Sequence, residues 1–179
     1  MSEFNSRNIA NYCRVLSTAL CEVTEQRFRL EQSPVALSKT QFTILRILNS
    51  AESLRVNEVA EYLRISGAAA SKNVDFLYGK KLIGRKVHSK DRRMAQVSLL
   101  EKGRRIVNDY QELCRSIHSK ALEIFSQDEQ DTLADLLGRY VCQTLKVENV
   151  SLHCLTCNGE LNKNCQLSGP EELCHCFYS

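Results

Sequence analysis

The sequence predicts a mainly α-helical protein with a small β-hairpin wing, that is, a winged helix-turn-helix followed by a short cysteine-rich tail. Three observations support this fold class. Apolar residues recur at helical spacing along most of the chain, two short β-prone runs follow a pair of short helices, and five of the nine cysteines lie in residues 154–179. With 179 residues, 43% of them hydrophobic and 25% charged, the chain is long enough for one globular core and a small appendage.

The first two helices are indicated by apolar spacing and by a capping signal. The first is expected from about Asn8 to Glu31, where apolar residues recur every three or four positions, and it ends where Ser33 precedes a proline. The next segment, "SKTQFTILRILNS", opens with Ser38 and has Gln41 three residues later. This is the spacing of a capping box, in which each side chain accepts a hydrogen bond from the backbone N–H of the other residue. We therefore expect a helix to begin directly after Ser38.

A helix-turn-helix and a wing are predicted for the centre of the chain. The short amphipathic segment "VNEVAEYLRIS" has Asn57 as its expected N-cap, and Ser66 with Gly67 supplies a cap or turn before "AAASKNVDFLYGKKL". Two short helices joined by a tight turn form a helix-turn-helix. The β-prone runs "LIGRKVH" and "AQVSLL" follow, and the charged turn "SKDRRM" between them predicts a hairpin with a basic tip.

Two further helices are expected after the wing. Helical periodicity returns after Gly103 and continues to Phe125. Another helix is expected from Ser126, because Glu129 occupies the capping-box position three residues later. Residues 147–151 then form the expected linker to the tail.

The positive charge is concentrated in one segment. Residues 38–105 contain 15 Lys and Arg against 6 Asp and Glu, a net charge of +9, so the rest of the chain must carry −6 to give the overall +3. A basic block of this kind is typical of a nucleic-acid-binding surface. The first residues lack an apolar segment behind a basic start, and no run approaches the roughly 18 apolar residues that span a bilayer. We therefore expect a cytoplasmic protein that does not contact a membrane.

The hairpin and the helix that follows it resemble the MarR family of bacterial winged-helix regulators. In "DRRMAQVSLLEKGRRI", Asp91 and Arg93 fall on the family's Asp-x-Arg pair, Val97 and Leu99 fall on its apolar strand, and residues 101–103 fall on its Glu-Lys-Gly helix start. The resemblance covers residues 5 to about 147.

Two positions depart from the family pattern. Leu100 stands where the family usually has a capping Thr or Ser, and Lys81 stands where a Gly usually ends the recognition helix. The first change removes a cap, and the second places a β-carbon where φ is often positive.

The resemblance implies an intertwined homodimer that binds double-stranded DNA at a pseudo-palindromic operator, with half-sites about 10 bp apart. In the family, the first helix and the last two helices intertwine, and the apolar faces of these helices are more extensive here than one winged domain needs. RNA polymerase is a further candidate partner. The expected organisation is a MarR-like DNA-binding and dimerisation domain at 1–147, with the winged helix at 38–105 and dimerisation helices at 5–32 and 103–146, and a cofactor-binding tail at 148–179.

The expected DNA contacts lie on the second helix of the helix-turn-helix and on the hairpin tip. The small side chains of Ala68, Ala69 and Ala70 allow a close approach to base edges, and the polar residues after them offer donors. The resemblance places Arg93 in the minor groove, oriented by Asp91, whereas a solvated turn is the alternative for such a charged tip. The expected contact residues are Ser66, Ala68, Ala69, Ser71, Lys72 and Asn73 on the helix, and Lys90, Asp91, Arg92 and Arg93 on the hairpin.

The tail cysteines follow the pattern C-x2-C-x7-C-x8-C-x-C, formed by Cys154, Cys157, Cys165, Cys174 and Cys176. In a reducing compartment, clustered thiols are more typical of metal or redox sites than of a structural disulfide frame. The short loop between the first two cysteines presents two sulfurs to one metal or cluster. We expect four of these five cysteines to be ligands.

Three kinds of site fit the tail. A structural zinc takes four ligands, an iron–sulfur cluster takes four thiolates and tolerates uneven spacing, and reversible disulfides need no metal. The spacing does not decide, although a paired zinc ribbon usually has two C-x2-C knuckles and the fifth thiol is surplus to a single zinc. We expect an iron–sulfur cluster of the 4Fe–4S type, with zinc as the alternative. The tail also resembles that of a cysteine-tailed subgroup of cyanobacterial MarR regulators, which implies oxygen-dependent control of tetrapyrrole genes.

The remaining cysteines, Cys13, Cys21, Cys114 and Cys142, are expected to be buried small hydrophobic residues. Cys13 is the exception, since peroxide-sensing relatives carry a reactive thiol in the first helix. If the tail holds structural zinc, Cys13 or a small-molecule ligand would supply the signal.

The other class of function is an enzyme or electron carrier that uses the winged domain only for protein contacts. The sequence contains no nucleophile–base constellation, phosphate loop or His-x-x-x-His pair. We therefore expect a regulator and no enzymatic activity.

Overall fold

The computed structural model describes residues 3–51, 53–88 and 91–147. The first long helix consists of α1 (Glu3–Ser17), a π-helical segment η1 (Thr18–Thr24), α2 (Glu25–Arg27) and a second π-helical segment η2 (Phe28–Gln32). The elements that follow are α3 (Lys39–Ser50), β1 (Leu54–Arg55), α4 (Val56–Leu63), α5 (Gly67–Gly79), β2 (Ile83–His88), β3 (Asp91–Leu99), α6 (Glu101–Leu122) and α7 (Gln127–Val147).

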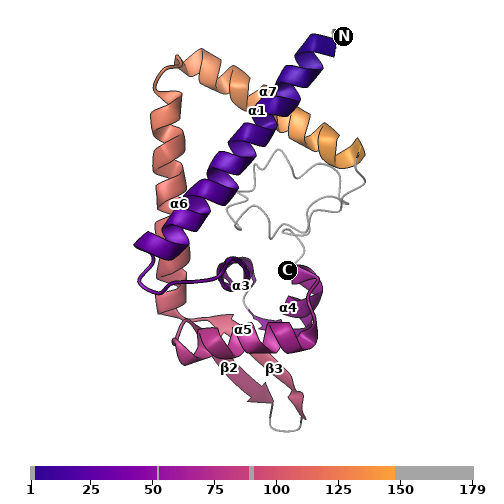
Figure 1. Cartoon of the computed structure of the whole chain (residues 1–179), viewed down its shortest axis with the longest axis vertical. Helices are drawn as coiled ribbons and strands as arrows, with labels where there is room; N and C mark the ends of the chain where they lie inside the picture. The colour runs from indigo at the N-terminus through magenta and orange to yellow at the C-terminus, as the bar shows by residue number, and fades with distance from the viewer. Residues whose placement is uncertain (1–2, 52, 89–90, 148–179) are drawn as a thin grey trace.

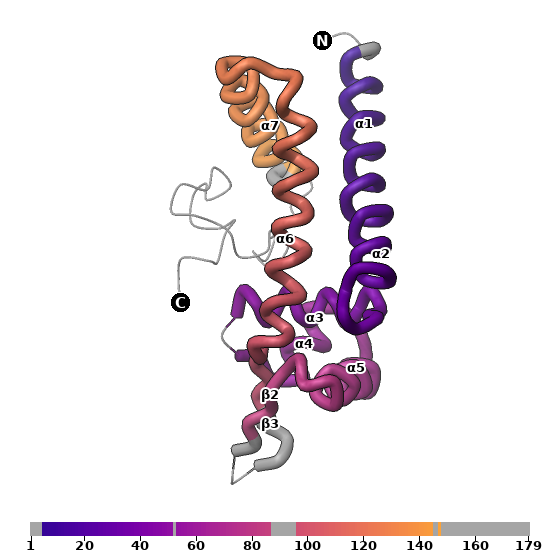
Figure 2. The backbone as a smooth tube through the Cα atoms, turned by 90° about the vertical axis from the view of Figure 1, so that its left-hand side faces the viewer, coloured from indigo at the N-terminus to yellow at the C-terminus, as the bar shows by residue number. Residues whose placement is uncertain are grey.

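These elements form two parts, a winged-helix part (α3 to β3) and a helical stem (α1 to η2, α6 and α7). In Figure 1 the winged-helix part lies at the bottom, with the β2–β3 hairpin projecting below α5. Figure 2 shows α1 and α6 rising from it, and α7 turning back at the far end of α6. The predicted fold class is confirmed as mainly helical with a small antiparallel sheet.

The hydrophobic core lies where the winged-helix part meets the first half of α6. Its centre is an aromatic group in which the Phe42 ring centroid is 5.8 Å from that of Phe28 and 5.1 Å from that of Tyr110. The largest fully buried side chains come from α3, α4, α5, the sheet and α6, and they include Ile44, Leu45, Leu48, Val59, Val74, Leu77, Ile83, Val97 and Ile106. One core therefore unites the helix-turn-helix, the wing and the start of the stem.

Three of the predicted helix starts are confirmed, and one is wrong. Ser38 and Gln41 form the capping box, with the Ser38 N–H donating to Gln41 Oε1 over 2.9 Å. Ser66 Oγ accepts from the Ala69 N–H, and Glu129 accepts from the Ser126 N–H. Asn57, however, is not a cap, because α4 begins at Val56 and Glu58 accepts the hydrogen bond of the Arg55 N–H instead.

The sheet contains one strand that periodicity did not predict. Its order is β1-β3-β2, all antiparallel, and Leu54 in the two-residue strand β1 pairs with Val97. The wing also differs from the prediction, since β3 begins at Asp91 and the residues "DRRM" therefore continue a strand rather than form the turn. The reason is backbone pairing with β2, in which His88 lies opposite Asp91.

Both departures from the family pattern have visible structural consequences. Lys81 has φ 57°, so the left-handed conformation is kept without glycine, and Leu100 occupies the N-cap of α6 without a side-chain cap. The Leu100 N–H donates instead to the Leu82 carbonyl over 3.0 Å. At Gly103 a β-carbon would lie 2.3 Å from the Leu82 carbonyl oxygen, so only glycine fits at this close approach.

Candidate nucleic-acid interface

The helix α5 has one face in the core and one face outside. Ala70, Val74 and Leu77 are fully buried, which fixes the inward direction of the helix. At 100° per residue, the opposite direction is occupied by Ala68 and Lys72, and both residues are exposed. The outward face is therefore available to a macromolecular partner along the whole helix.

The predicted contact residues of α5 are distributed over this outward face and its two flanks. Ser66 is exposed at the N-cap, Ala68 and Lys72 face outward, and Ala69 and Ser71 are half-buried on the flanks. The expectation that Ala70 helps the helix approach DNA is wrong, because this residue has 0% exposure and packs inward.

Asn73 was expected to offer its amide to DNA, and the structure gives this amide an internal partner. Asn73 Nδ2 donates to the Ala69 carbonyl oxygen over 2.8 Å, within the same helix. In the free protein its donor is therefore engaged, and a base contact would require the side chain to change its rotamer or to use the remaining N–H and the carbonyl oxygen.

An ion pair that sequence reasoning missed joins the recognition helix to the wing. Arg85 Nη2 in β2 lies 3.0 Å from Asp75 Oδ1 in α5. The carboxylate is 59% exposed and stands near the outward face, where an uncompensated negative charge would repel phosphates. The Arg85 guanidinium offsets this charge and holds the base of the wing against the helix. Ten residues separate the pair, and no short-range pattern could have indicated it.

The tip of the wing belongs largely to the undescribed part of the chain. Lys90 lies outside the described residues, and for Asp91, Arg92 and Arg93 only the backbone in β3 is described. The predicted roles of these four residues remain predictions.

The tail cysteines Cys154, Cys157, Cys165, Cys174 and Cys176 also lie outside the described residues. Within the described ranges, no group of three or more His, Cys, Asp and Glu residues is arranged to hold a metal. In those same ranges, no helix is long and apolar enough to cross a membrane.

The four cysteines of the helices are less buried than expected. Cys13 and Cys21 are exposed in the single chain, and Cys114 and Cys142 are half-buried. Burial nonetheless raises the pKa of the Cys114 thiol, and its hydrogen bond with Tyr110 and the nearby Arg46 oppose that effect. The interpretation as a buried hydrophobic residue is therefore wrong for Cys21 within one copy of the chain, and Cys13, which was excepted from it, is also exposed there.

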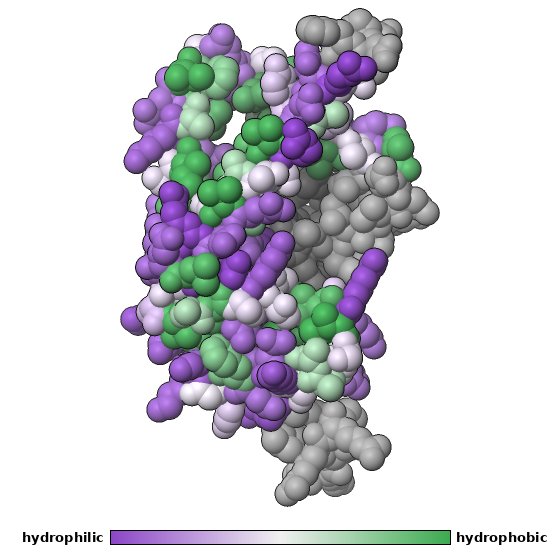
Figure 3. All heavy atoms as spheres, in the orientation of Figure 1, coloured by the Kyte–Doolittle hydropathy of each residue, from purple (hydrophilic) through white to green (hydrophobic). Residues whose placement is uncertain are grey.

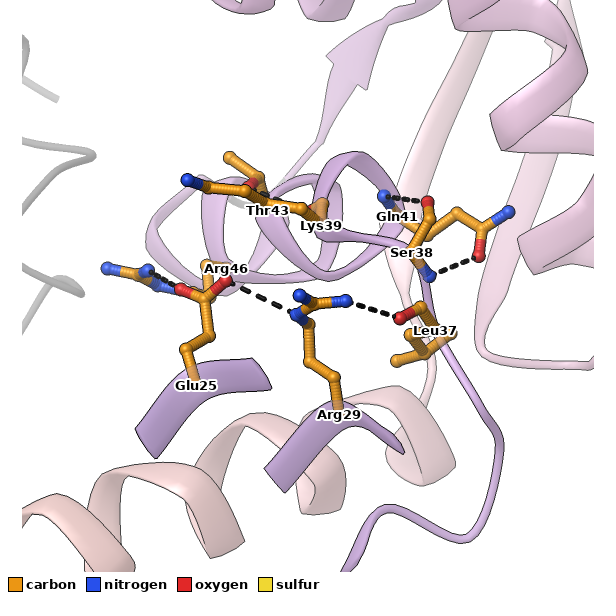
Figure 4. Close-up of polar contacts among 8 residues, drawn as sticks. All are labelled: Glu25, Arg29, Leu37, Ser38, Lys39, Gln41, Thr43 and Arg46. Atoms are coloured by element: carbon orange, nitrogen blue, oxygen red, sulfur yellow. Dashed lines mark hydrogen bonds and ion pairs between the residues drawn. The ribbon is translucent and has the colours of Figure 1, made fainter. Parts of the chain in front are cut away.

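The junction between stem and winged-helix part contains a buried ionic network, shown in Figure 4. Glu25 of α2 is 4% exposed and bridges two arginines, with Oε1 3.3 Å from Arg29 Nε and Oε2 3.1 Å from Arg46 Nη1 of α3. Arg29 Nη1 also donates to the Leu37 carbonyl over 2.7 Å. These contacts tie the first helix to the start of the helix-turn-helix.

The stem carries large apolar residues on its surface. In Figure 3 hydrophobic residues reach the surface along α1, α6 and α7. Tyr12 is 70% exposed and Ile124 is 82% exposed. Other exposed apolar residues of the stem are Ile9, Val15, Leu16, Val23, Leu30, Leu136, Leu137, Tyr140 and Val141.

Comparison with known proteins identifies the winged-helix part. Residues 37–94, from the start of the helix-turn-helix to the wing, match the MarR family. The chain contains a MarR-family domain. MarR proteins are transcription regulators and not enzymes. The chain is 29% identical over 103 residues to YpoP of Bacillus subtilis, an uncharacterised HTH-type transcriptional regulator. That match covers 58% of this chain and 73% of YpoP.

Solved structures show the same fold over most of this chain. Rv1404 from Mycobacterium tuberculosis superposes with a TM-score of 0.68 at 23% identity, over 79% of this chain and 95% of that one. A MarR family protein from Bacillus stearothermophilus gives a TM-score of 0.66 at 24% identity, over 82% and 99%. A Staphylococcus aureus MepR mutant bound to an oligodeoxyribonucleotide gives 0.59 at 22% identity, over 76% and 97%.

Proposed function

We propose that the protein is a dimeric, sequence-specific DNA-binding transcription regulator whose cysteine tail holds an iron–sulfur cluster and responds to oxygen or redox state. The observation that carries the DNA-binding part is the outward face of α5, where Ala68 and Lys72 stand opposite a fully buried face. The segment 38–105, which includes α5, carries a net charge of +9 and would attract the negatively charged phosphate backbone of DNA.

Each copy inserts α5 into the major groove, and the hairpin β2–β3 lies over the adjacent minor groove. Small residues at the start of α5 let the backbone approach base edges, and Lys72 donates to a base or a phosphate. Arg93 enters the minor groove, with Asp91 fixing its direction, and Lys90 and Arg92 contact phosphates. The same fold occurs in a MepR mutant bound to an oligodeoxyribonucleotide, which supports this arrangement.

The exposed apolar residues of the stem support a dimer with a second copy of the chain. The stem exposes many large apolar side chains, among them Tyr12 of α1 and Leu136 and Leu137 of α7. A set of this size is not typical of singly scattered surface residues and indicates an interaction surface. A two-fold symmetric contact between stems would cover them, and it would set two α5 helices on successive major grooves. The operator is then pseudo-palindromic, with half-site centres about 10 bp apart.

The tail donor set fits an iron–sulfur cluster. Cys154, Cys157, Cys165, Cys174 and Cys176 offer five thiols for four ligand positions, and thiolates are the usual ligands of such clusters. The tail follows directly after α7 of the stem. A change in the cluster would therefore act on the helices that set the distance between the two α5 helices, provided that its two states favour different dimer arrangements.

Zinc is the second candidate for the tail, because the pair at Cys154 and Cys157 is also a zinc knuckle. In that case the tail is structural, and a small ligand or the exposed Cys13 supplies the signal. Iron and acid-labile sulfide analysis after anaerobic purification separates the two. A brown protein with iron and sulfide in equal amounts supports the cluster, and a colourless protein with about one zinc per chain supports the structural site.

The DNA-binding role is tested by titrating the anaerobic protein against DNA selected from a random pool. Lys72→Ala should weaken binding to the selected sequence, and Arg93→Ala should weaken binding to all DNA and lower the salt dependence. Lys120→Ala, at the far end of α6, is the matched loss of one positive charge away from the interface. Equal affinity of all four proteins would refute the proposed interface. A truncation after Val150 that keeps DNA binding and the oxygen response would refute the sensor role.

A further inference from the structure

The outward face of α5 contains one large apolar side chain that its core does not explain. Phe76 is 37% exposed and lies four residues after Lys72, which places it about 6 Å further along the helix and 40° around it. The neighbouring buried positions Val74 and Leu77 fill the core, and they have 0% exposure. Phe76 thus lies on the flank of the outward face, on the side of Lys72 and away from the buried row.

The surroundings of Phe76 are suited to nucleic acid. Lys80 Nζ lies 5.7 Å from the centroid of the Phe76 ring, so a positive charge accompanies the aromatic side chain. A β-carbon built at Gly79 would meet no heavy atom of the described residues within 4 Å, apart from its chain neighbours and the backbone of its own helix, so this side of the helix is open. The pair of Phe76 and Lys80 suits nucleic acid, because the apolar ring can contact an apolar group on a base edge while the ammonium group contacts a nearby phosphate.

We propose that Phe76 is a specificity-determining residue that packs against the C5-methyl group of a thymine in the major groove, while Lys80 contacts a neighbouring phosphate. Phenylalanine has no hydrogen-bonding group, and the thymine methyl is the apolar feature that the major groove offers. The contact would favour a T·A pair over a C·G pair at one position of each half-site. This inference rests on the proposed DNA-binding function and adds a base preference to it.

The experiment replaces a single methyl group. An operator is first selected with the wild-type protein, and each thymine is then replaced in turn by deoxyuridine, which lacks the methyl but keeps every hydrogen-bonding group. At one position of each half-site, replacing a single thymine should lower the affinity of the wild-type protein about fourfold. Replacing that thymine in both half-sites should lower the affinity roughly fifteenfold. The Phe76→Ala dimer lacks the contact in both half-sites, so its affinity for the thymine operator should fall by a factor similar to that of the double replacement. Its affinity should not change when uracil replaces thymine at that position.

Two matched variants separate this contact from other effects. Tyr78 is 51% exposed on the same helix but points 160° away from Phe76 around the axis, so Tyr78→Ala should keep the full response to uracil. Lys80→Ala should weaken binding to all sequences and lower its salt dependence, and it too should keep the uracil response. Phe76→Leu keeps an apolar contact and should retain part of the preference.

The inference is overturned if Phe76→Ala still distinguishes thymine from uracil at every position, or if no thymine methyl affects wild-type binding. Neither outcome would contradict the DNA-binding role, because the experiment starts from an operator that the wild-type protein has already selected. Failure of the selection, with no sequence enriched and no binding above that of random DNA, would refute the proposed function itself.

Discussion

The winged-helix part and the helical stem are both built from amphipathic helices, but they cover their apolar faces differently. Phe42, Val59 and Val74 of the winged-helix part have 0% exposure, whereas Tyr12 and Val15 of α1 are 70% and 57% exposed. The first set finds its partners inside one chain. The second set needs another surface, because exposed apolar patches on this scale are costly in water. The comparison teaches that the same helical periodicity can indicate either a core or an interface.

The comparison also locates the border between the two parts. The core extends up α6 through Ile106 and Val107 to Tyr110, and Phe28 joins it from the first helix. Beyond Tyr110, the side chains of Leu113 and Cys114 are half-buried, and in the connection after α6 Ile124 is 82% exposed. The Glu25 network lies at this border, so it is the place where a change in the stem would reach α3.

The largest expected effect comes from the core of the winged-helix part. Phe42→Ala removes a fully buried ring that contacts the rings of Phe28 and Tyr110, and it should lower the free energy of unfolding by about 3–5 kcal/mol. Urea denaturation followed by circular dichroism measures this change. Phe125→Ala, at a 37% exposed position of the stem, is the control and should cost far less. Equal losses would contradict the division into a self-contained part and a partner-dependent part.

The second effect concerns the junction. Glu25→Gln keeps the shape of the side chain but leaves Arg29 and Arg46 without their carboxylate, and it should lower the free energy of unfolding by about 2 kcal/mol, since Arg46 is partly exposed. Glu101→Gln breaks the exposed pair with Arg105 and should cost less than about 0.5 kcal/mol. Thermal denaturation of the two variants gives both values. Equal losses in the free energy of unfolding for the two variants would contradict the role of the Glu25 network in stabilising the junction.

A third prediction concerns the stem alone. Leu136→Ala removes an apolar side chain that is 53% exposed in the single chain and covered in the proposed dimer. The dissociation constant of the dimer should rise at least about tenfold, because each copy loses apolar area from the interface. Sedimentation equilibrium measures this constant. Asp131→Ala, at an exposed polar position of the same helix, is the control. A monomeric wild-type protein would refute the dimer.

The smallest expected effect is a pH dependence at the border. Burial raises the pKa of the Cys114 thiol, and burial followed by the hydrogen bond with Cys114 raises the pKa of Tyr110. In the unfolded chain both groups ionise near their ordinary values of 9.0 and 10.0, so above about pH 9 the unfolded state gains a stabilisation that the folded state lacks.

The free energy of unfolding should therefore be unaffected by these groups below pH 9 and should fall as pH rises further. Tyr110→Phe should reduce this alkaline decline, because it removes the hydroxyl whose pKa burial raises. Denaturant titrations at several alkaline pH values give the slope. Identical slopes for wild type and Tyr110→Phe would show that the hydroxyl does not stay protonated in the folded state.

Local signals in the sequence predicted most helix boundaries, because capping and periodicity depend on residues three or four positions apart. The box formed by Ser38 and Gln41 is one case, and the cap formed by Ser66 is another. The start of α4 was placed wrongly because Asn57 is a favoured N-cap residue by type, whereas the helix is capped two residues earlier, where Glu58 accepts from the Arg55 N–H. The strand β1 was missed because two residues are too few to show alternation.

The candidate interface was predictable in its place but not in its details. The sequence predicted the position of the recognition helix and named Lys72 on its outward face. It also contains the spacing of the tail thiols. These features depend only on residues that are close together in the chain. Tertiary structure alone decided that Ala70 faces the core, that Asp75 pairs with Arg85 and that Phe76 remains exposed. These facts depend on which surface packs against α5, and that packing is set by α3, α4 and β2, whose contacts with α5 are formed only when the chain folds.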